Sequence, residues 1–313
     1  VTAIHGGTSL SVSGYPFYAS DTGGYRGGRP SKESFVRWME YAAILPIWQY
    51  GGAGENHNAW DFTEYEGSTF DQEVLDAFRR YAVLHTRLWP YYQAEVAEML
   101  AEGEPMVLPQ GLADPAGGVH HEENFFVGDD LFVAPVLEAG TFSLSVEFPT
   151  GNWVHWWTGE GYEGGVTGEV ESLLGEGPLF QRWPSAIPML RRTVETLSPV
   201  EDESVDSWYG DRGALNARII PGEGAGFRLA TGEAVAAESL ASIVLSAGSD
   251  YVGWDVEVYA PDFVGVAADG VALEPGDEDC ESCFVVDEPW VRVILPECSA
   301  TLKDTVQITN AAR

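Results

Sequence analysis

The sequence predicts an α/β region followed by an all-β region. Up to residue 103, short apolar runs alternate with stretches of helical periodicity. From residue 120 the chain turns into short β-rich runs separated by Gly and Pro. With 313 residues it is long enough for two or three domains with cores of their own.

The first elements are a short helix over residues 1–13 and an apolar strand over 15–20, followed by the Gly-rich loop 21–30. Ser31 then suits the N-cap of a second helix, whose apolar positions recur at helical spacing from Phe35 to Leu45.

Pro46 ends this second helix and leads directly into a second strand, Ile47 to Tyr50. After a polar loop over 51–68, Thr69 and Gln72 resemble a capping box. The long helical stripe that follows is predicted to be kinked at Pro90 and ends at Gly103.

Loop lengths indicate how these strands are used. The helix-to-strand connection is essentially Pro46, whereas the strand-to-helix connections, 21–30 and 51–68, are long. That asymmetry is typical of a (β/α)8 TIM barrel, in which the carboxyl ends of the strands build the active site. An open doubly wound sheet has the same asymmetry, but no strand–helix alternation follows residue 103. About two of the eight strands are present, so we expect the C-terminal fragment of a barrel.

The β-rich part predicts β-sandwich domains. Its strands are expected within 132–137, 141–148, 153–157, 179–190, 217–220, 242–245, 256–259, 291–295 and 305–309. Residues 194–206 are expected to form a linker. The predicted domains are therefore 1–112 for the barrel part, 113–199 for a proximal sandwich and 200–313 for a distal β domain.

Charge excludes some classes of partner. Asp and Glu number 49 and Lys and Arg 16, which gives a formal net charge of −33. A field of this sign repels phosphate backbones and anionic membrane surfaces, so we expect no nucleic-acid or membrane partner. A salty habitat or a secreted lifestyle would each explain the acidity, and the latter favours an extracellular or periplasmic location.

The three cysteines are Cys280, Cys283 and Cys298. Zinc needs about four ligands and no histidine follows them, so no metal site is expected. One disulfide with a spare thiol and three reduced cysteines both remain open. No run approaches the roughly 18 apolar residues of a membrane span. The chain opens on Val-Thr-Ala-Ile, already inside a pattern, so we expect its true N-terminus to lie upstream.

Three stretches together resemble glycoside hydrolase family 31, the α-glucosidase and α-xylosidase group of retaining enzymes. They are GYPFYASDTGGY with the helix FVRWMEYAAILP, then FRRYAVLHTRLWPYYQAEVAEMLAEGEPMVLP, and then VGDDLFVAPVLEAG with FPTGNWVHWWTG. They cover roughly residues 10–190, and their order and spacing carry the resemblance.

The resemblance implies an α-glycoside or oligosaccharide substrate, no cofactor, and two carboxylates about 5–5.5 Å apart. In the family both carboxylates lie on earlier barrel strands, so we expect none of the catalytic residues in this chain and no catalysis by it alone. A non-catalytic carbohydrate-binding module and an α-transglycosylase are the alternatives.

Asp21 is the first candidate substrate-binding residue. The matching family Asp hydrogen-bonds sugar hydroxyls, and a carboxylate accepts two such donors with charge-assisted strength. The alternative is an Asp that tightens the Gly23–Gly24 turn. Trp48 is a second candidate, either stacking on a sugar or filling the barrel.

The second strand departs from the family. Many members end it with Met-Arg-x-His, whereas here Gly51 occupies the position of the sugar-contacting His. This argues against plain α-glucosidase specificity. The following loop offers Glu55, His57 and Trp60, and we hypothesise that His57 or Glu55 replaces the missing contact; a solvated surface loop is the alternative.

Overall fold

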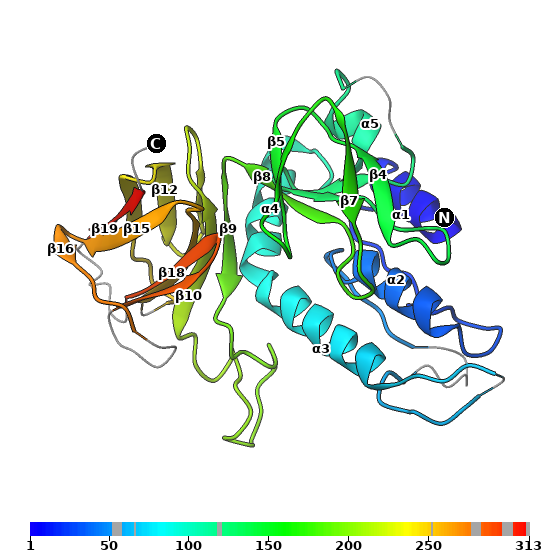
Figure 1. The fold of residues 1–313 in the computed structure, drawn as a ribbon. Coiled ribbons are helices and arrows are strands. Elements are labelled where there is room, and N and C mark those ends of the chain that lie inside the picture. Colours follow the sequence, from blue (N-terminus) through cyan, green and yellow to red (C-terminus); the bar gives the residue numbers. More distant parts are fainter. Residues whose placement is uncertain are drawn as a thin grey trace. The chain divides into compact units, whose positions relative to one another are not determined.

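The structure is a computed structural model, and it describes residues 1–51, 58–65, 67–117, 121–251, 253–276, 283–295 and 303–310. The described chain mixes helices with largely antiparallel sheets and divides into two compact units. The first unit comprises Val1–His85 and Glu98–Gln181, and the second Thr86–Ala97 and Arg182–Arg313. Figure 1 shows the course of the chain.

Within the described residues, the helices lie in the N-terminal part (Figure 1). They are α1 (Thr2–Val12), α2 (Lys32–Ala42), α3 (Gln72–Arg87), α4 (Trp89–Glu102) and α5 (Gln110–Ala113). As predicted, Ser31 caps α2, since its side chain accepts a hydrogen bond from the Ser34 N–H at 3.2 Å.

Two predictions for the helices were wrong in detail. The carboxylate of Asp71, not Thr69, accepts a hydrogen bond from the N–H of Val74 at the start of α3, so Asp71 is the cap. The predicted kinked helix is two helices that break at Leu88. The break precedes Pro90 by two residues, because proline suits the first turn of a new helix but not a helix interior.

The described residues of the first unit form two sheets. One has the order β1-β2-β3-β8-β5-β6 and the other pairs β4 with β7. Their strands are β1 (Val107–Pro109), β2 (Phe125–Val127), β3 (Leu131–Val133), β4 (Ser143–Glu147), β5 (Asn152–His155), β6 (Gly161–Glu163), β7 (Thr167–Glu171) and β8 (Leu179–Trp183). Aromatic side chains dominate their shared core, with Phe132, Trp153 and Phe180 fully buried.

The described part of the second unit also has two sheets, in the orders β17-β18-β14-β10-β9 and β11-β12-β13-β19-β15-β16. The first of them consists of β9 (Ser185–Leu190), β10 (Ala214–Ile220), β14 (Gly253–Tyr259), β17 (Cys283–Asp287) and β18 (Trp290–Leu295). The second consists of β11 (Gly226–Arg228), β12 (Ala234–Ser239), β13 (Ser242–Ser246), β15 (Phe263–Ala268), β16 (Val271–Ala272) and β19 (Lys303–Asn310). One apolar cluster draws on both sheets. The pair β10–β14 is parallel and the other pairs are antiparallel.

Two further expectations are corrected. The single run predicted over 179–190 is two strands, β8 and β9, divided at Pro184, which has no N–H for a sheet hydrogen bond. Cys283 is disulfide-bonded, so the alternative of three reduced cysteines was wrong. The other two cysteines lie outside the described residues.

Candidate functional site

The two short segments predicted as strands meet at a single parallel bridge between Asp21 and Gln49. The N–H of Thr22 donates to the carbonyl of Gln49 at 3.1 Å and fixes the register. The Asp21 carboxylate therefore lies where two neighbouring parallel segments end together, as the loop-length pattern predicted. No regular ladder forms around the bridge within the described residues.

The residues flanking Asp21 point toward the helices. Ser20 accepts a hydrogen bond from the Trp38 indole of α2 at 3.0 Å, and Thr22, which is fully buried, accepts one from the Trp48 indole at 2.9 Å. Since side chains alternate along an extended segment, Asp21 points to the opposite, partly exposed side.

Trp48 lies on the helix-facing side. Its ring packs against Phe78 with centroids 5.3 Å apart and meets His85 edge-on at 5.9 Å. These contacts favour the packing role over stacking on a sugar. Burial lowers the pKa of His85, whose Nδ1 lies 2.9 Å from the Ala43 carbonyl oxygen, so this histidine is held neutral behind the site.

Gln49 is a site residue that the sequence reasoning missed. Its side-chain amide is exposed and donates to the Asp21 carboxylate at 2.8 Å. The signal was available, because strand alternation places Gln49 on the side of the strand opposite Trp48. One Asp21 oxygen is thereby oriented, and the carboxylate retains further acceptor sites.

The glycines after Asp21 serve the turn. Gly23 and Gly24 have φ of 86° and 98°, where only glycine is unstrained, and the Gly24 N–H donates to the Asp21 carbonyl at 2.8 Å. A Cβ on Gly23 would lie 2.8 Å from the Phe35 ring. Asp21 therefore stabilises this turn through its backbone carbonyl. Its side-chain carboxylate takes no part in the turn and can bind other donors.

An aromatic loop follows the second segment. Trp60 is 57% exposed, with its ring 6.0 Å from Phe78 and 6.3 Å from Tyr50. Arg29, from the loop that begins at Asp21, donates to the Thr63 carbonyl at 2.6 Å and anchors this loop. Glu55 and His57 lie outside the described residues. In the part of the chain that is described, no cluster of metal-binding side chains occurs and no helix is long and apolar enough to cross a membrane.

Two models of a known family match the chain. The family 31 glycosyl hydrolase TIM-barrel domain matches residues 2–95, and the family 31 C-terminal domain matches residues 103–187. Together they cover more than half of the chain.

Relatives and solved structures agree with this match. The Escherichia coli sulfoquinovosidase is 31% identical over 60% of this chain and 28% of its own length. The α-xylosidase of Saccharolobus solfataricus is 26% identical over 72% of this chain and 29% of its own length.

Among solved structures, the cycloalternan-forming enzyme of Listeria monocytogenes, in complex with a pentasaccharide substrate, aligns with a TM-score of 0.76. It is 22% identical over 98% of this chain and 30% of its own, so it supports the fold. The chain spans less than a third of the length of these relatives. Its order of motifs, the bridge at Asp21 and both family matches lead to one conclusion: the chain belongs to glycoside hydrolase family 31.

Proposed function

We propose that this chain supplies part of the substrate-binding site of a retaining α-glycosidase. In this proposal residues 1–112 are the C-terminal part of the (β/α)8 barrel, 113–199 the proximal β-sandwich and 200–313 the distal β domain. The two catalytic carboxylates belong to barrel strands upstream of residue 1. The substrate is an α-glycoside or oligosaccharide.

The observation that carries the proposal is the placement of Asp21. Its carboxylate lies beside an exposed amide donor, at the end of two parallel segments, on the side facing away from the helices. Gln49 occupies one acceptor position, and the others suit hydroxyl donors of a sugar ring. Glu55, His57 and Trp60 stay proposed as further contacts from the adjoining loop, while we reassign Trp48 to packing.

The sugar differs from plain glucose in this proposal. At Gly51, where the resemblance places a sugar-contacting histidine, an added Cβ would meet no atom of the described residues within 4 Å. This open space accommodates an extra group on the sugar or a side chain from the adjoining loop.

The test is the stereochemistry of the reaction. The complete polypeptide that contains these residues should hydrolyse an aryl α-glycoside, with NMR showing the α-anomer as the first product. The 313-residue chain alone should give no turnover, because it lacks the proposed carboxylate pair. A β-anomer first product, or turnover by the chain alone, would contradict the proposal; a complete polypeptide that binds sugar without turnover would point to a binding module.

A transglycosylase is the second candidate. A related isomaltosyltransferase from Sporosarcina globispora is 27% identical over 60% of this chain. Exposed Trp60 beside the site offers a face on which an acceptor sugar stacks. Product analysis with an oligosaccharide separates the two, since a transglycosylase yields longer saccharides at the expense of free monosaccharide.

A further inference from the structure

Helix α2 lies between the candidate sugar site and two loops of the β-rich part of the first unit. We propose that Arg37 and Glu40 of α2 are positioning residues, which hold Asp21 in place by locking this helix onto the loops at 140–141 and 172–177. Only the role of Asp21 toward sugar rests on the function proposed above; the mechanical coupling stands on the contacts alone.

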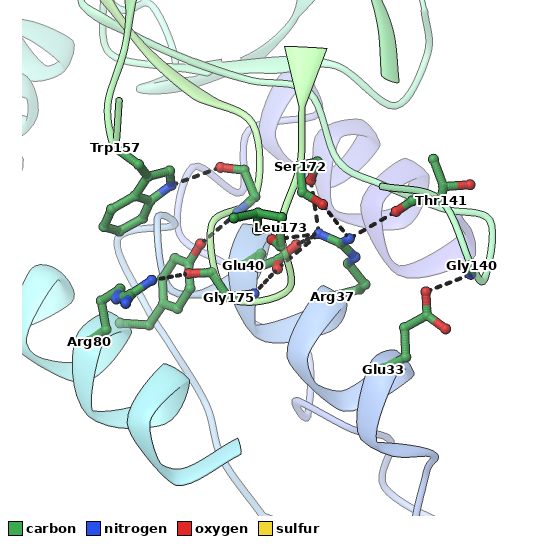
Figure 2. Close-up of polar contacts among 12 residues, drawn as sticks. Glu33, Arg37, Glu40, Arg80, Gly140, Thr141, Trp157, Ser172, Leu173 and Gly175 are labelled. Carbon is green, nitrogen blue, oxygen red and sulfur yellow. Dashed lines mark hydrogen bonds and ion pairs between the residues drawn. The ribbon is translucent and has the colours of Figure 1, made fainter. Parts of the chain in front are cut away.

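Arg37 ties α2 to both loops (Figure 2). Its guanidinium, 7% exposed, donates to the Thr141 carbonyl, the Ser172 carbonyl and the Ser172 hydroxyl, each at 2.9 Å. It also donates to the Leu173 carbonyl at 3.3 Å. Four contacts from one rigid, planar group fix both position and rotation of the helix face.

Glu40, one turn further along α2, completes the lock. Its carboxylate accepts from Arg37 at 3.0 and 3.1 Å and from the Gly175 N–H at 2.8 Å. The fit is close, because a Cβ added to Gly177 would lie 2.6 Å from Glu40 Oε2. The Glu40 side chain therefore leaves little room for the loop at 172–177 to move relative to α2.

Helix α3 holds the same loop independently of α2. Arg80 donates to the Gly175 carbonyl at 3.1 Å (Figure 2). It also donates to the Glu176 carboxylate at 2.9 Å. The N–H of Gly177 donates to the Tyr81 hydroxyl at 3.2 Å. The loop is thus a fixed support, against which α2 is located.

Other side chains of α2 reach the site. The indole of Trp38 donates to the Ser20 hydroxyl at 3.0 Å, and the Tyr41 hydroxyl lies 3.4 Å from the same oxygen. Ser20 immediately precedes Asp21. A displacement of α2 is therefore passed through Ser20 to the bridge that aligns Asp21 with Gln49.

Amide hydrogen exchange in the 313-residue chain tests the coupling. The reporter is the Thr22 N–H, which donates to Gln49 across the bridge. Gly177→Ala and Trp38→Phe should each speed exchange at Thr22 by about five- to tenfold, the worth of roughly one hydrogen bond, and Arg37→Met, which removes several hydrogen bonds, should speed it more. Trp38→Phe and Gly177→Ala keep the test valid should Arg37→Met fail to fold.

Arg80→Met is the matched control. It removes two hydrogen bonds to the same loop, but the Gly177–Tyr81 hydrogen bond still holds that loop to α3 and every contact of α2 is kept, so Thr22 exchange should stay at the wild-type rate. Amides of the β3–β8 pair report on the global stability of the first unit and should keep their protection in Trp38→Phe, Gly177→Ala and Arg80→Met; in Arg37→Met, which destabilises the whole unit, Thr22 exchange is compared with theirs. The proposal is overturned if Thr22 exchange is unchanged in Trp38→Phe and Gly177→Ala, or if it rises only in step with the β3–β8 amides.

Kinetics of the complete polypeptide test whether the position of α2 affects substrate binding by Asp21. Trp38→Phe should raise KM for an α-glycoside more than it lowers kcat, with Arg80→Met unaffected. Faster exchange at Thr22 with wild-type kcat/KM would overturn the positioning role while leaving the glycosidase assignment intact. Absence of turnover by the wild-type polypeptide would instead contradict the proposed function and leave the exchange result standing.

Discussion

Replacing Arg37 by Met should destabilise the first unit in a pH-dependent way. The substitution keeps most of the apolar stem and removes the cation beside Glu40, which is 6% exposed. Burial raises the pKa of Glu40 to about 7, although the charge and hydrogen bonds of Arg37 and the Gly175 N–H act against this rise. Arg37 is therefore what permits the carboxylate to ionise inside the protein.

The size of the destabilisation caused by Arg37→Met depends on whether Glu40 is ionised. The pKa of Glu40 is raised on folding. Its contribution to the free energy of unfolding is therefore fully present below about pH 4.5 and is lost as pH rises through about 7. At pH 8 Arg37→Met leaves a buried carboxylate without its cation, which costs about 3–5 kcal/mol. At pH 5.5 the carboxyl is protonated in both proteins, so the cost should be smaller by up to about 1.4 kcal/mol, the equivalent of the one pH unit between pH 8 and the folded pKa of about 7.

Calorimetry at the two pH values checks this. At pH 8 the transition of the first unit should fall by about 10 °C, given about 2–4 °C per kcal/mol for units of this size. The double variant Arg37→Met/Glu40→Leu should recover most of the loss, since it removes both charges. Arg80→Met, which breaks a partly exposed ion pair with Glu176, should cost under about 1 kcal/mol at either pH. Equal costs for Arg37→Met at both pH values, or no recovery in the double variant, would refute the reasoning.

Two further outcomes are expected. In the second unit, burial raises the pKa of Glu257, but Arg192, Arg218 and Arg87 outweigh it and hold that pKa below its ordinary value. Glu257→Gln should therefore cost about 3–5 kcal/mol near pH 7 and less as pH falls below about 4, measured on the second unit's unfolding transition; a pH-independent cost would contradict this. In the complete polypeptide, His57→Ala should lower kcat/KM for an α-glycoside about tenfold, and an unchanged value would remove His57 from the site.

Local patterns predicted the elements that depend on local chemistry. Ser31 as a cap follows from an oxygen placed to accept a free helix N–H, and this was confirmed. Asp71 was missed because Thr69 with Gln72 matches the same pattern two residues earlier. Gln49 carries neither a charge nor an aromatic ring, so its residue type gave no signal; its role comes from its register opposite Asp21.

Long-range partners lay beyond sequence reasoning. Arg37 forms an ion pair with Glu40 three residues further along α2, a spacing that helix periodicity alone makes available. The acceptors at Thr141 and Ser172 lie more than a hundred residues away and appear only when the loops fold against α2. The link from these loops to Ser20 therefore emerged from the structure.

The most direct test of the central claim is the effect of Asp21→Ala on the complete polypeptide. Losing charge-assisted hydrogen bonds to the sugar should lower kcat/KM for an α-glycoside by about a hundredfold. Asp76→Ala, which removes an exposed carboxylate from α3, serves as the control and should leave kcat/KM unchanged. If Asp21→Ala folds normally and keeps kcat/KM within about twofold of wild type, Asp21 does not bind the substrate and the proposed role of this site is contradicted.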